Sequence, residues 1–430
     1  MRIGQVARVT ALAVASVVAL VLSLHLGGAA RAANTPASRG VRALTDQQVA
    51  AMAPDVQARY LAPLRAAAEA LHAYGIGKGA NIFTAVGINA NNHTVDLYVT
   101  EPDRAAAFEH SAAAAASDVD LNMVRVHSAR HTRIALDRAV SIFLAARHPF
   151  AVYAASADAN GAGITIQVRD SATVRAAGST RTAAPAGPGL NGITIRYTAG
   201  TPLVPKSWNA AKWHDVAPFI GGDVLTANGV AYCTAGLPAV RKSDNVPVMV
   251  TAKHCFAIGK RIYTGAGATF QYGNRRLGSY VGRVTAAAAH WDAETIPAPD
   301  NADESDTSRW MPLSSVSYSY LGDYVCQSGQ RSAALGHPTP CGIKVTNQDI
   351  TYVFNGAKVR GVEGVDIHGW GSVNGDSGGT VFANLGHGIR QARGIISNGG
   401  KDGTADQRRV QWTEAVDIFR QFGLKLNPVQ

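Results

Sequence analysis

The sequence predicts a mostly β protein, in which an all-β domain over residues 206–430 follows an α+β segment over residues 33–205. From about residue 215 onward, short strand-like runs are interrupted by Gly, Asn and Pro, which is typical of β sandwiches and barrels. Before residue 198, strand-like alternation recurs between helix-like stretches. Residues 198–205 contain two prolines and one glycine and read as the linker between the two parts.

Composition excludes several classes of protein. The chain has 430 residues, of which 47% are hydrophobic and 16% charged, so it is neither globally disordered nor a coiled coil. The net charge is +10, but the excess is only +3 in residues 1–32, +3 in residues 33–205 and +4 in residues 206–430. Because no dense basic block is present to follow phosphates, nucleic-acid binding is not expected.

Residues 1–32 have the layout of a secretory signal peptide. Arg2 and Arg8 precede the apolar run 9–26, and Ala30-Arg31-Ala32 offers small residues for cleavage. The alternative is an uncleaved anchor, because the apolar run is slightly long. Cleavage is preferred, and we expect a secreted, extracellular protein with a disordered spacer over residues 33–42.

The α+β segment begins with a helix signal. Thr45 and Gln48 form the Thr-x-x-Gln pattern of a capping box. Apolar residues at helical spacing, with proline interruptions, continue to Leu71 and predict helical structure. Further helices are expected over residues 103–116 and 132–146.

Strand-like stretches in this segment repeat at an offset of 69 positions. Residues 95–99 and 164–168 both alternate apolar and polar side chains, like half-buried strands. The same offset relates residues 124–126 to residues 193–195. The repeat predicts a duplicated unit, each copy a hairpin followed by one more strand.

The β domain carries one helical pattern, over residues 413–424 at its end. Apolar side chains recur there at helical spacing, including Ala415, Phe419 and Phe422. We therefore expect a C-terminal helix on an otherwise all-β domain.

Residues 375–379, Gly-Asp-Ser-Gly-Gly, are the most informative motif. A nucleophilic serine needs a tight turn that aims backbone N–H groups at the substrate carbonyl oxygen, and flanking glycines permit such a turn. The motif also fits the nucleophile elbow of α/β-hydrolases, whose acid and histidine follow the serine. After Ser377 the chain has only His387, with no acid between them, so that alternative fails.

A histidine and an acid precede the serine in a workable order. His254 ends a strand-like run, and Asp292 lies among apolar neighbours. An imidazole that is oriented by a buried carboxylate can remove the proton of a serine hydroxyl. The gaps of 38 and 85 residues are long enough for different strands to bring the three residues together. His290 is the rival base and ranks far below His254.

The four cysteines are expected to be oxidised outside the cell. Three pairings are possible, and none of the spacings is the C-x-x-C of a zinc site. The nearest-neighbour pairs, Cys233–Cys255 and Cys326–Cys341, close the shorter loops and are the ones that we predict. A free-thiol or metal role is the minority alternative.

From about residue 208 to the end, the sequence resembles secreted bacterial serine proteases of the chymotrypsin fold, of the streptogrisin and α-lytic protease types. The resemblance implies a chymotrypsin-like double β-barrel with a C-terminal helix, preceded by a pro-region over residues 33–205. It rests on Thr251-Ala252-x-His254-Cys255, Asp292-x-x-x-Ile296, Val325-Cys326-x-Ser328-Gly329, Cys341-Gly342 and Gly375–Gly379.

The resemblance also implies roles for individual residues. His254 is then the general base, Asp292 the orienting acid and Ser377 the nucleophile, with Gly375 and Ser377 donating the N–H groups of the oxyanion hole. Ser397-Asn398-Gly399 resembles the edge segment that pairs with the substrate backbone.

Two positions depart from the family pattern. Lys253 stands before the histidine where the family more often has Gly, and its effect on the local turn stays open. Gly371 stands where trypsin-like members carry an acid at the base of the substrate pocket. We therefore expect an uncharged or apolar P1 residue, with Asp402 or Asp406 as the acids to consider otherwise.

The sequence thus predicts a secreted serine endopeptidase that forms an acyl-enzyme and needs no cofactor or metal. Its expected partners are protein or peptide substrates and its own pro-region, with no nucleic acid, no membrane after signal removal, and a monomeric state. The alternatives are a catalytically inactive protease-like binding protein and an esterase that uses the same triad.

Overall fold

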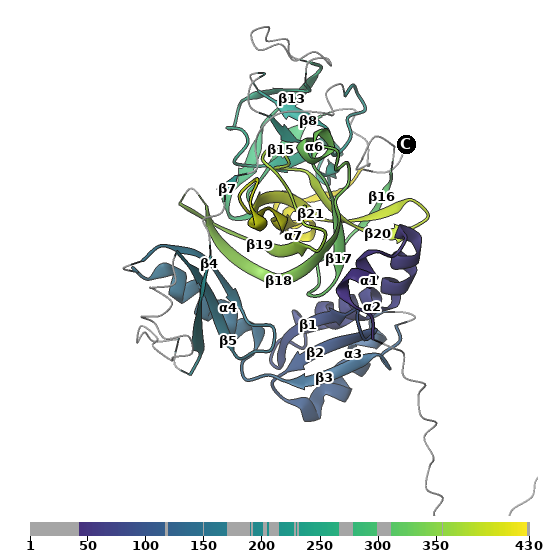
Figure 1. Ribbon diagram of the computed structural model, residues 1–430, viewed down its shortest axis with the longest axis vertical. Coiled ribbons are helices and arrows are strands. Elements are labelled where there is room, and N and C mark those ends of the chain that lie inside the picture. Colours follow the sequence, from purple (N-terminus) through teal and green to yellow (C-terminus); the bar gives the residue numbers. More distant parts are fainter. Residues whose placement is uncertain are drawn as a thin grey trace, which may run out of the picture. The chain divides into compact units, whose positions relative to one another are not determined.

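A computed structural model describes most of the chain beyond the expected signal peptide and spacer, which lie outside the described residues (Figure 1). Among the described residues, no helix is both long enough and apolar enough to cross a membrane. The described residues are 43–116, 119–148, 150–169, 190, 192–200, 204–205, 215–227, 229, 232–265, 278–298, 311–354 and 356–427.

Two helices open the α+β segment, α1 (Asp46–Ala50) and α2 (Pro54–Gly75). The expected capping box is present: the Thr45 hydroxyl accepts from the Gln48 N–H, and the Gln48 side chain accepts from the Thr45 N–H. Pro54 begins α2, where no intrahelical N–H is needed. Pro63 lies inside α2, which nevertheless continues to Gly75. Its apolar face buries Leu61, Leu64, Ala68 and Leu71.

The strands that follow have the same arrangement twice. In each copy a hairpin is extended by a third strand that runs parallel to the second. A 3₁₀ turn, η1 (Pro102–Arg104), and helix α3 (Ala105–Ala114) precede β3, and helix α4 (Arg133–Ala145), capped by Thr132, joins the two copies. The strands are β1 (Phe83–Asn89), β2 (Thr94–Val99) and β3 (Val124–Ser128), then β4 (Val152–Ala157), β5 (Gly163–Val168) and β6 (Thr194–Ala199).

The first half of the following region forms two sheets. One has the order β13-β12-β8-β9 and the other β14-β15-β11-β10-β23. Their strands are β8 (Val224–Thr226), β9 (Tyr232–Thr234), β10 (Pro238–Arg241), β11 (Pro247–Ala252), β12 (Arg261–Tyr263), β13 (Tyr280–Arg283), β14 (Ala286–Ala288), β15 (Ala293–Pro297) and β23 (Leu424–Leu426).

The second half forms a ring of strands in the order β17-β20-β21-β22-β19-β18, because β18 also pairs back to β17. Trp412 is fully buried inside this group of strands with Val362, Val381 and Ile396. The sequence predicts two closed barrels. Among the described residues, strand pairing closes the second half into a ring and leaves the first half as two separate sheets, so a double barrel is not confirmed. The strands are β16 (Leu313–Val316), β17 (Tyr324–Ser328), β18 (Cys341–Phe354), β19 (Ala357–Asp366), β20 (Thr380–Gly386), β21 (Ile389–Gly399) and β22 (Arg409–Glu414).

The helices of the second half are short, so the region is mostly β as predicted. The C-terminal helix α7 (Ala415–Phe422) is shorter than the expected 413–424, because Thr413 pairs with Ile395 and Leu424 with Arg241 in neighbouring ladders. The second half also contains α6 (Gln330–Ala334) and η3 (Ala405–Arg408), and η2 (Ala289–Trp291) lies between β14 and β15 of the first half.

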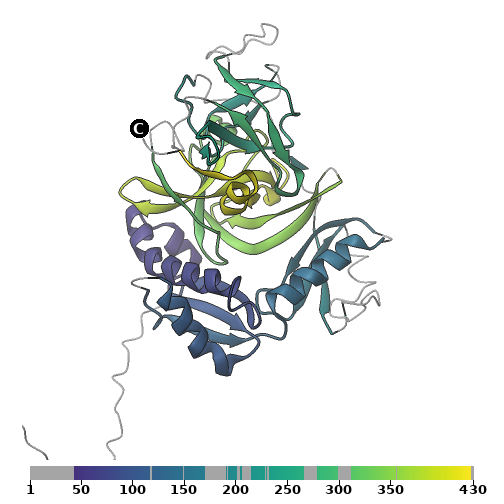
Figure 2. The same ribbon diagram turned by 180° about the vertical axis from the view of Figure 1, so that it is seen from behind.

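The long hairpin β18–β19 contacts the α+β segment. Thr351 and Tyr352 of β18 pair with Ala155 and Ala154 of β4, so the sheet continues from the ring into β5 and β6. Figure 1 shows β4 alongside β18, and Figure 2 shows the same strands from behind.

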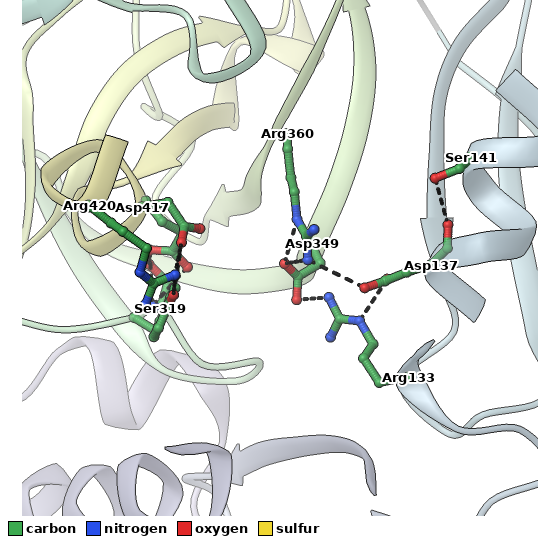
Figure 3. Close-up of polar contacts among 10 residues, drawn as sticks. Arg133, Asp137, Ser141, Ser319, Asp349, Arg360, Asp417 and Arg420 are labelled. Carbon is green, nitrogen blue, oxygen red and sulfur yellow. Dashed lines mark hydrogen bonds and ion pairs between the residues drawn. The ribbon is translucent and has the colours of Figure 1, made fainter. Parts of the chain in front are cut away.

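An ion-pair cluster lies beside this strand pairing (Figure 3). Arg133 and Asp137 of α4 meet Asp349 and Arg360 of the hairpin, and each arginine contacts both carboxylates. We call these four residues the hairpin ion cluster. It places two positive and two negative charges together across two elements that are far apart in sequence.

Candidate active site

Ser377 lies in a tight turn just before β20. Gly375 and Gly378 have φ angles of 109° and 87°, which disfavour residues with a side chain. A Cβ on Gly378 would lie 2.1 Å from Thr251 Oγ1 and 2.4 Å from the Thr234 carbonyl oxygen. The glycines of the motif are therefore required by the backbone conformation and by the closeness of strands β9 and β11.

His254 follows strand β11 and reaches the serine. Its Nε2 atom is 2.9 Å from Ser377 Oγ, and its side chain is largely buried. The neighbouring Cys255 is bonded to Cys233 of β9, which ties the turn after β11 to the adjacent sheet. Lys253 is exposed, and its N–H donates to the Asp292 carbonyl, so the bulky residue does not disturb this turn.

Asp292 completes the contact on the other side of the imidazole. Its Oδ2 lies 2.7 Å from His254 Nδ1, and its Oδ1 accepts from the His254 backbone N–H at 2.9 Å. The Ser397 hydroxyl also donates to Oδ2. Asp292 has a left-handed φ of 41° as it leaves η2, and its side chain is buried. The carboxylate therefore favours the tautomer with the proton on Nδ1, which leaves Nε2 to accept the serine proton.

The predicted oxyanion donors lie in the same turn. In the described part of the chain, the N–H groups of Gly375 and Ser377 have no protein acceptor. The Gly375 carbonyl faces the interior, where it accepts from Thr234 Oγ1 and Gln330 Nε2. Both N–H groups are thus available to an oxygen that approaches Ser377.

Asp376 stabilises this turn through hydrogen bonds to neighbouring residues. Its Oδ1 accepts from the N–H groups of Arg331 and Ser332 in the first turn of α6. Its Oδ2 accepts from the Ser332 hydroxyl and from the Val373 N–H. Backbone donors at the start of the helix and one hydroxyl therefore balance this fully buried carboxylate.

The predicted substrate-binding edge at the end of β21 is already paired with another strand of this chain. Strand β7 (Val204–Pro205) runs antiparallel to the end of β21, with Pro205 opposite Asn398 and Val204 opposite Gly399. Ser397 faces Asp292 instead, through its side chain. The backbone of this edge therefore accepts an extended segment of the chain close to the predicted triad.

The residues expected around a substrate pocket have separate surroundings. Gly371 is buried, its carbonyl accepts from Gln327, and a Cβ would lie 2.4 Å from the Arg408 carbonyl oxygen. Asp402 accepts from the Asn374 N–H, and Asp406 pairs with Arg409. Both alternative acids therefore have partners inside the protein.

Sequence reasoning missed Glu294, a buried acid beside the predicted triad. It lies on β15 two residues after Asp292 and is fully buried, and neither carboxyl oxygen has a partner among the described residues. Burial, and then the charge of Asp292, raise its pKa to about 10. An acidic residue inside an apolar strand pattern was the available signal.

The rival base His290 packs instead against Trp291.

Sequence reasoning also missed two aromatic residues of the hairpin. The Phe354 ring meets the His254 ring edge-on, with centroids 5.2 Å apart. Tyr352, two residues earlier on β18, is fully buried with its hydroxyl beside Asn398 and Ser397. No sequence pattern links a hairpin residue to a distant histidine, because the contact depends on how the strands pair.

Both predicted disulfides are present, Cys233–Cys255 and Cys326–Cys341. The sulfur atoms of Cys233 and Cys255 lie within 4.8 Å of a nitrogen of His254. Because they are bonded to each other, they are not thiolate ligands, and this group is not a fitting metal site.

No family model matches the sequence, and no curated protein matches it. Among solved structures, the fold is similar to Nocardiopsis protease, with 20% identity over 49% of this chain and 99% of that chain and a TM-score of 0.37. It is also similar to Thermobifida fusca protease A, with 18% identity over 48% of this chain and 97% of that chain and a TM-score of 0.38. A third similar structure is Cellulomonas bogoriensis chymotrypsin, with 19% identity over 48% and 97% of the two chains and a TM-score of 0.36. Two of these neighbours are named as proteases and the third as a chymotrypsin.

Proposed function

We propose that this chain is a secreted serine endopeptidase that cleaves peptide bonds through an acyl-enzyme. The observation that carries the proposal is the hydrogen-bonded series Ser377–His254–Asp292, with distances of 2.9 Å and 2.7 Å. It lies next to two N–H groups that have no acceptor among the described residues. Each group has the partner that nucleophilic catalysis by serine requires.

The proposed first step forms the acyl-enzyme. Ser377 Oγ attacks the carbonyl carbon while its proton passes to His254 Nε2, and Asp292 stabilises the resulting imidazolium. The carbonyl oxygen becomes an oxyanion held by the N–H groups of Gly375 and Ser377. When the tetrahedral species collapses, the C–N bond breaks and the leaving amine takes the proton from His254.

The second step returns the enzyme to its starting state. Water attacks the ester carbon while His254 accepts a proton from it, and a second oxyanion forms in the same place. Collapse breaks the bond to Ser377 Oγ, which recovers its proton from His254. The products are a carboxylic acid and an amine, so atoms and charges balance.

The pairing of β7 with β21 favours a peptide over a simple ester as the substrate. An extended backbone already lies antiparallel to Asn398 and Gly399, beside the triad. Recognition by strand addition uses backbone hydrogen bonds, which a peptide offers on every residue. A simple ester lacks such a backbone, so an esterase that uses the same triad would not use this edge.

Covalent labelling tests whether the site is catalytic. A fluorophosphonate should label Ser377, and Ser377→Ala should abolish both labelling and peptide hydrolysis, with kcat reduced by about 10⁴-fold or more. His254→Ala should be about as severe. Ser314→Ala, at an exposed serine of β16, is the control and should label normally. Normal labelling and peptide hydrolysis by the Ser377→Ala protein would exclude the mechanism. If the fluorophosphonate does not label the wild-type protein, the alternative of a catalytically inactive binding protein is favoured.

We propose an uncharged or apolar P1 residue, because Gly371 supplies no carboxylate and the nearby acids already have partners. A buried substrate arginine without a counter-charge is costly. A peptide-library profile measures this preference. A profile dominated by Arg or Lys would contradict it.

We further propose that residues 1–32 are a signal peptide, residues 33–205 a pro-region and residues 206–430 the protease domain. The contacts of Arg65 support a docked pro-region. This side chain is 6% exposed, its Nε lies 3.0 Å from Asp323 Oδ1, and its other nitrogens donate to the carbonyls of Tyr324 and Asn384.

Two further contacts support the same proposal. The pairing of β4 with β18 and the hairpin ion cluster attach the second copy of the repeat to the proposed protease domain. Strand β7, the last two residues of the expected linker, lies on the proposed substrate edge. Residues 200–206 are then the proposed region of self-cleavage, which would follow occupation of that edge.

A further inference from the structure

The hydroxyl of Ser332 has three polar neighbours. Trp370 Nε1 donates to its Oγ at 2.9 Å, and Gln327 Nε2 donates to it at 3.1 Å. The hydroxyl itself donates to Asp376 Oδ2. A serine hydroxyl has one proton to donate and two lone pairs that accept. Because the two N–H donors occupy both lone pairs, the proton of Ser332 is directed to the carboxylate.

The surroundings of the Gln327 amide fix which of its ends faces Ser332. Its Nε2 also donates to the Gly371 carbonyl at 3.2 Å and to Asp376 Oδ2 at 3.4 Å. Three oxygen acceptors therefore surround one NH₂ group. If the amide turned over, its own oxygen would face a carbonyl and a carboxylate, neither of which can donate. Gln327 is thus held as a donor.

The indole of Trp370 is held by a second ring. His337 stacks on it, with ring centroids 3.8 Å apart and planes inclined by 13°. The backbone N–H of His337 donates to the Ser332 carbonyl, and the backbone N–H of Trp370 donates to Asp366 Oδ1. Ser332 is fully buried, whereas His337 is exposed. The exposed imidazole therefore covers the indole and fixes the direction in which the Trp370 side chain donates.

We propose that Trp370 is a positioning residue for the oxyanion turn: its indole N–H, held by the His337 stack, orients the Ser332 hydroxyl toward Asp376. The backbone of Asp376 lies between the two residues that carry the proposed oxyanion donors, so a shift of this side chain moves both N–H groups. Trp370 acts through Ser332 and does not need to touch the substrate. The inference rests on the proposed function, because it assigns this support to the proposed oxyanion hole.

A second series of the same kind supplies a matched control. Trp412 Nε1 donates to Ser319 Oγ at 2.9 Å, and Ser319 Oγ donates to Glu414 Oε2 at 3.0 Å. All three side chains are buried, and none belongs to the proposed triad or the oxyanion turn. Replacing tryptophan by phenylalanine therefore removes the same kind of hydrogen bond at both places, but only one of them supports the turn.

The kinetic test compares Trp370→Phe, His337→Ala, their double variant and Trp412→Phe, all produced from the full chain. Trp370→Phe keeps an aromatic ring for the stack and loses the N–H. It should lower kcat about three- to tenfold with KM within twofold, because oxyanion donors act mainly in the transition state. His337→Ala, at an exposed position where folding is not at risk, should lower kcat by a smaller factor. Trp412→Phe should keep kcat and KM even if its thermal midpoint falls.

The double variant tests whether the two rings act in series. If they do, it should be no slower than Trp370→Phe alone, because the stack matters only through the indole N–H. Losses in kcat that multiply in the double variant would contradict this order of action.

Amide hydrogen exchange gives a readout that does not require turnover, in a Ser377→Ala background that prevents self-digestion. The N–H groups of Gly378 and Gly379 are hydrogen-bonded, so their exchange reports opening of the turn. Both should exchange about three- to tenfold faster in Trp370→Phe and at the parental rate in Trp412→Phe. This result, with a parent enzyme that hydrolyses no peptide, would support the positioning role and reject the proposed function. Unchanged kcat and exchange in Trp370→Phe, or equal losses of kcat in Trp412→Phe, would overturn the inference.

Discussion

At the scale of single residues, the site depends on buried polar groups whose partners come from other elements. Asp376 accepts hydrogen bonds from α6, and Asp292 is hydrogen-bonded to the backbone and side chain of His254. Ser377 is hydrogen-bonded to the imidazole of His254. Buried groups of this kind lose much of their stabilisation when one partner is removed. Substitutions at the partners should therefore affect activity even though the partners do not touch the substrate.

Ser332→Ala tests the support beneath the oxyanion turn. The Ser332 hydroxyl donates to Asp376 and accepts from Trp370 Nε1 and Gln327 Nε2, so its loss leaves several buried groups unsatisfied. We expect kcat/KM to fall at least about tenfold, because a hydrogen bond to a charged group is worth about 1.5–3 kcal/mol. Steady-state kinetics with a peptide substrate measure this, with Ser314→Ala as the control. Equal kinetics in the two variants would contradict the proposed support.

Glu294→Gln tests the unpartnered buried acid. In the unfolded chain its carboxyl ionises above about pH 4.5, whereas the folded protein keeps the proton up to about pH 10. The folded state therefore binds more protons between these values, and the free energy of unfolding should fall as pH rises through this window. Glu294→Gln removes that contribution and should flatten the decline.

The measurement is the thermal midpoint at pH 5 and pH 9, in a Ser377→Ala background that prevents self-digestion. Glu294→Gln should gain most over its parent at pH 9. Glu101→Gln, at an exposed carboxyl, should keep the parental slope. If Glu294→Gln declines as steeply as the parent, Glu294 is already ionised in the folded protein.

Much of the site at this scale could be predicted from residue types and their order. The Gly-Asp-Ser-Gly-Gly motif, a histidine at the end of a strand and an acid among apolar residues led to Ser377, His254 and Asp292, which the structure brings together. Phe354 could not be linked to His254 in the same way. Their contact depends on how strand pairing places β18, which no local pattern encodes.

At the scale of elements, local signals predicted helices better than strand partners. The capping box at Thr45 and the periodicity over residues 132–146 gave helix starts and ends close to those observed. The C-terminal helix was predicted too long because pairing of Thr413 and Leu424 in neighbouring ladders outweighs their helical spacing. The extension of β18 by β4 had no sequence signal, since either strand is compatible with many partners.

Arg65→Met tests how α2 attaches to the β domain. The substitution keeps the apolar stem but removes the guanidinium that contacts Asp323 and two carbonyl oxygens. Asp323 retains Arg393 as a partner at 3.3 Å, so the β domain itself should remain folded. We expect the separate segment 33–205 to bind the processed enzyme about 10- to 100-fold more weakly, the equivalent of 1.5–3 kcal/mol.

The measurement is the inhibition constant of the added segment. Arg59→Met, on an exposed position of the same helix, is the control and should inhibit like the unmodified segment. Equal inhibition by Arg65→Met and Arg59→Met would show that the buried arginine is not an anchor.

At the scale of the whole molecule, the division into an α+β segment over residues 33–205 and a β domain over residues 206–430 stays a prediction. The proposed pro-region has a physical purpose in such a chain. The ring of strands is built from pairings between distant residues, and long-range pairings fold slowly. A folded segment that binds the hairpin β18–β19 would stabilise the two strands with which the more distant strands β17 and β22 must pair.

Refolding tests that role. Residues 206–430 should regain activity slowly when refolded alone, and markedly faster when residues 33–205 are added as a separate chain. Recovered peptidase activity against time is the measurement, and the Arg65→Met segment should accelerate recovery less than the unmodified one. Recovery that is equally fast without any added segment would reject the folding role.

The pairing of β7 with the edge of β21 has a consequence for the timing of activity. While residues 200–206 are intact, the segment is tethered, and its effective concentration at the site is independent of how dilute the protein is. Once that stretch is cut, the same contacts become an ordinary bimolecular equilibrium. If the chain acts as proposed, inhibition would then fade on dilution, so that enzyme released into a large volume would become active while the same enzyme in a confined space would stay blocked.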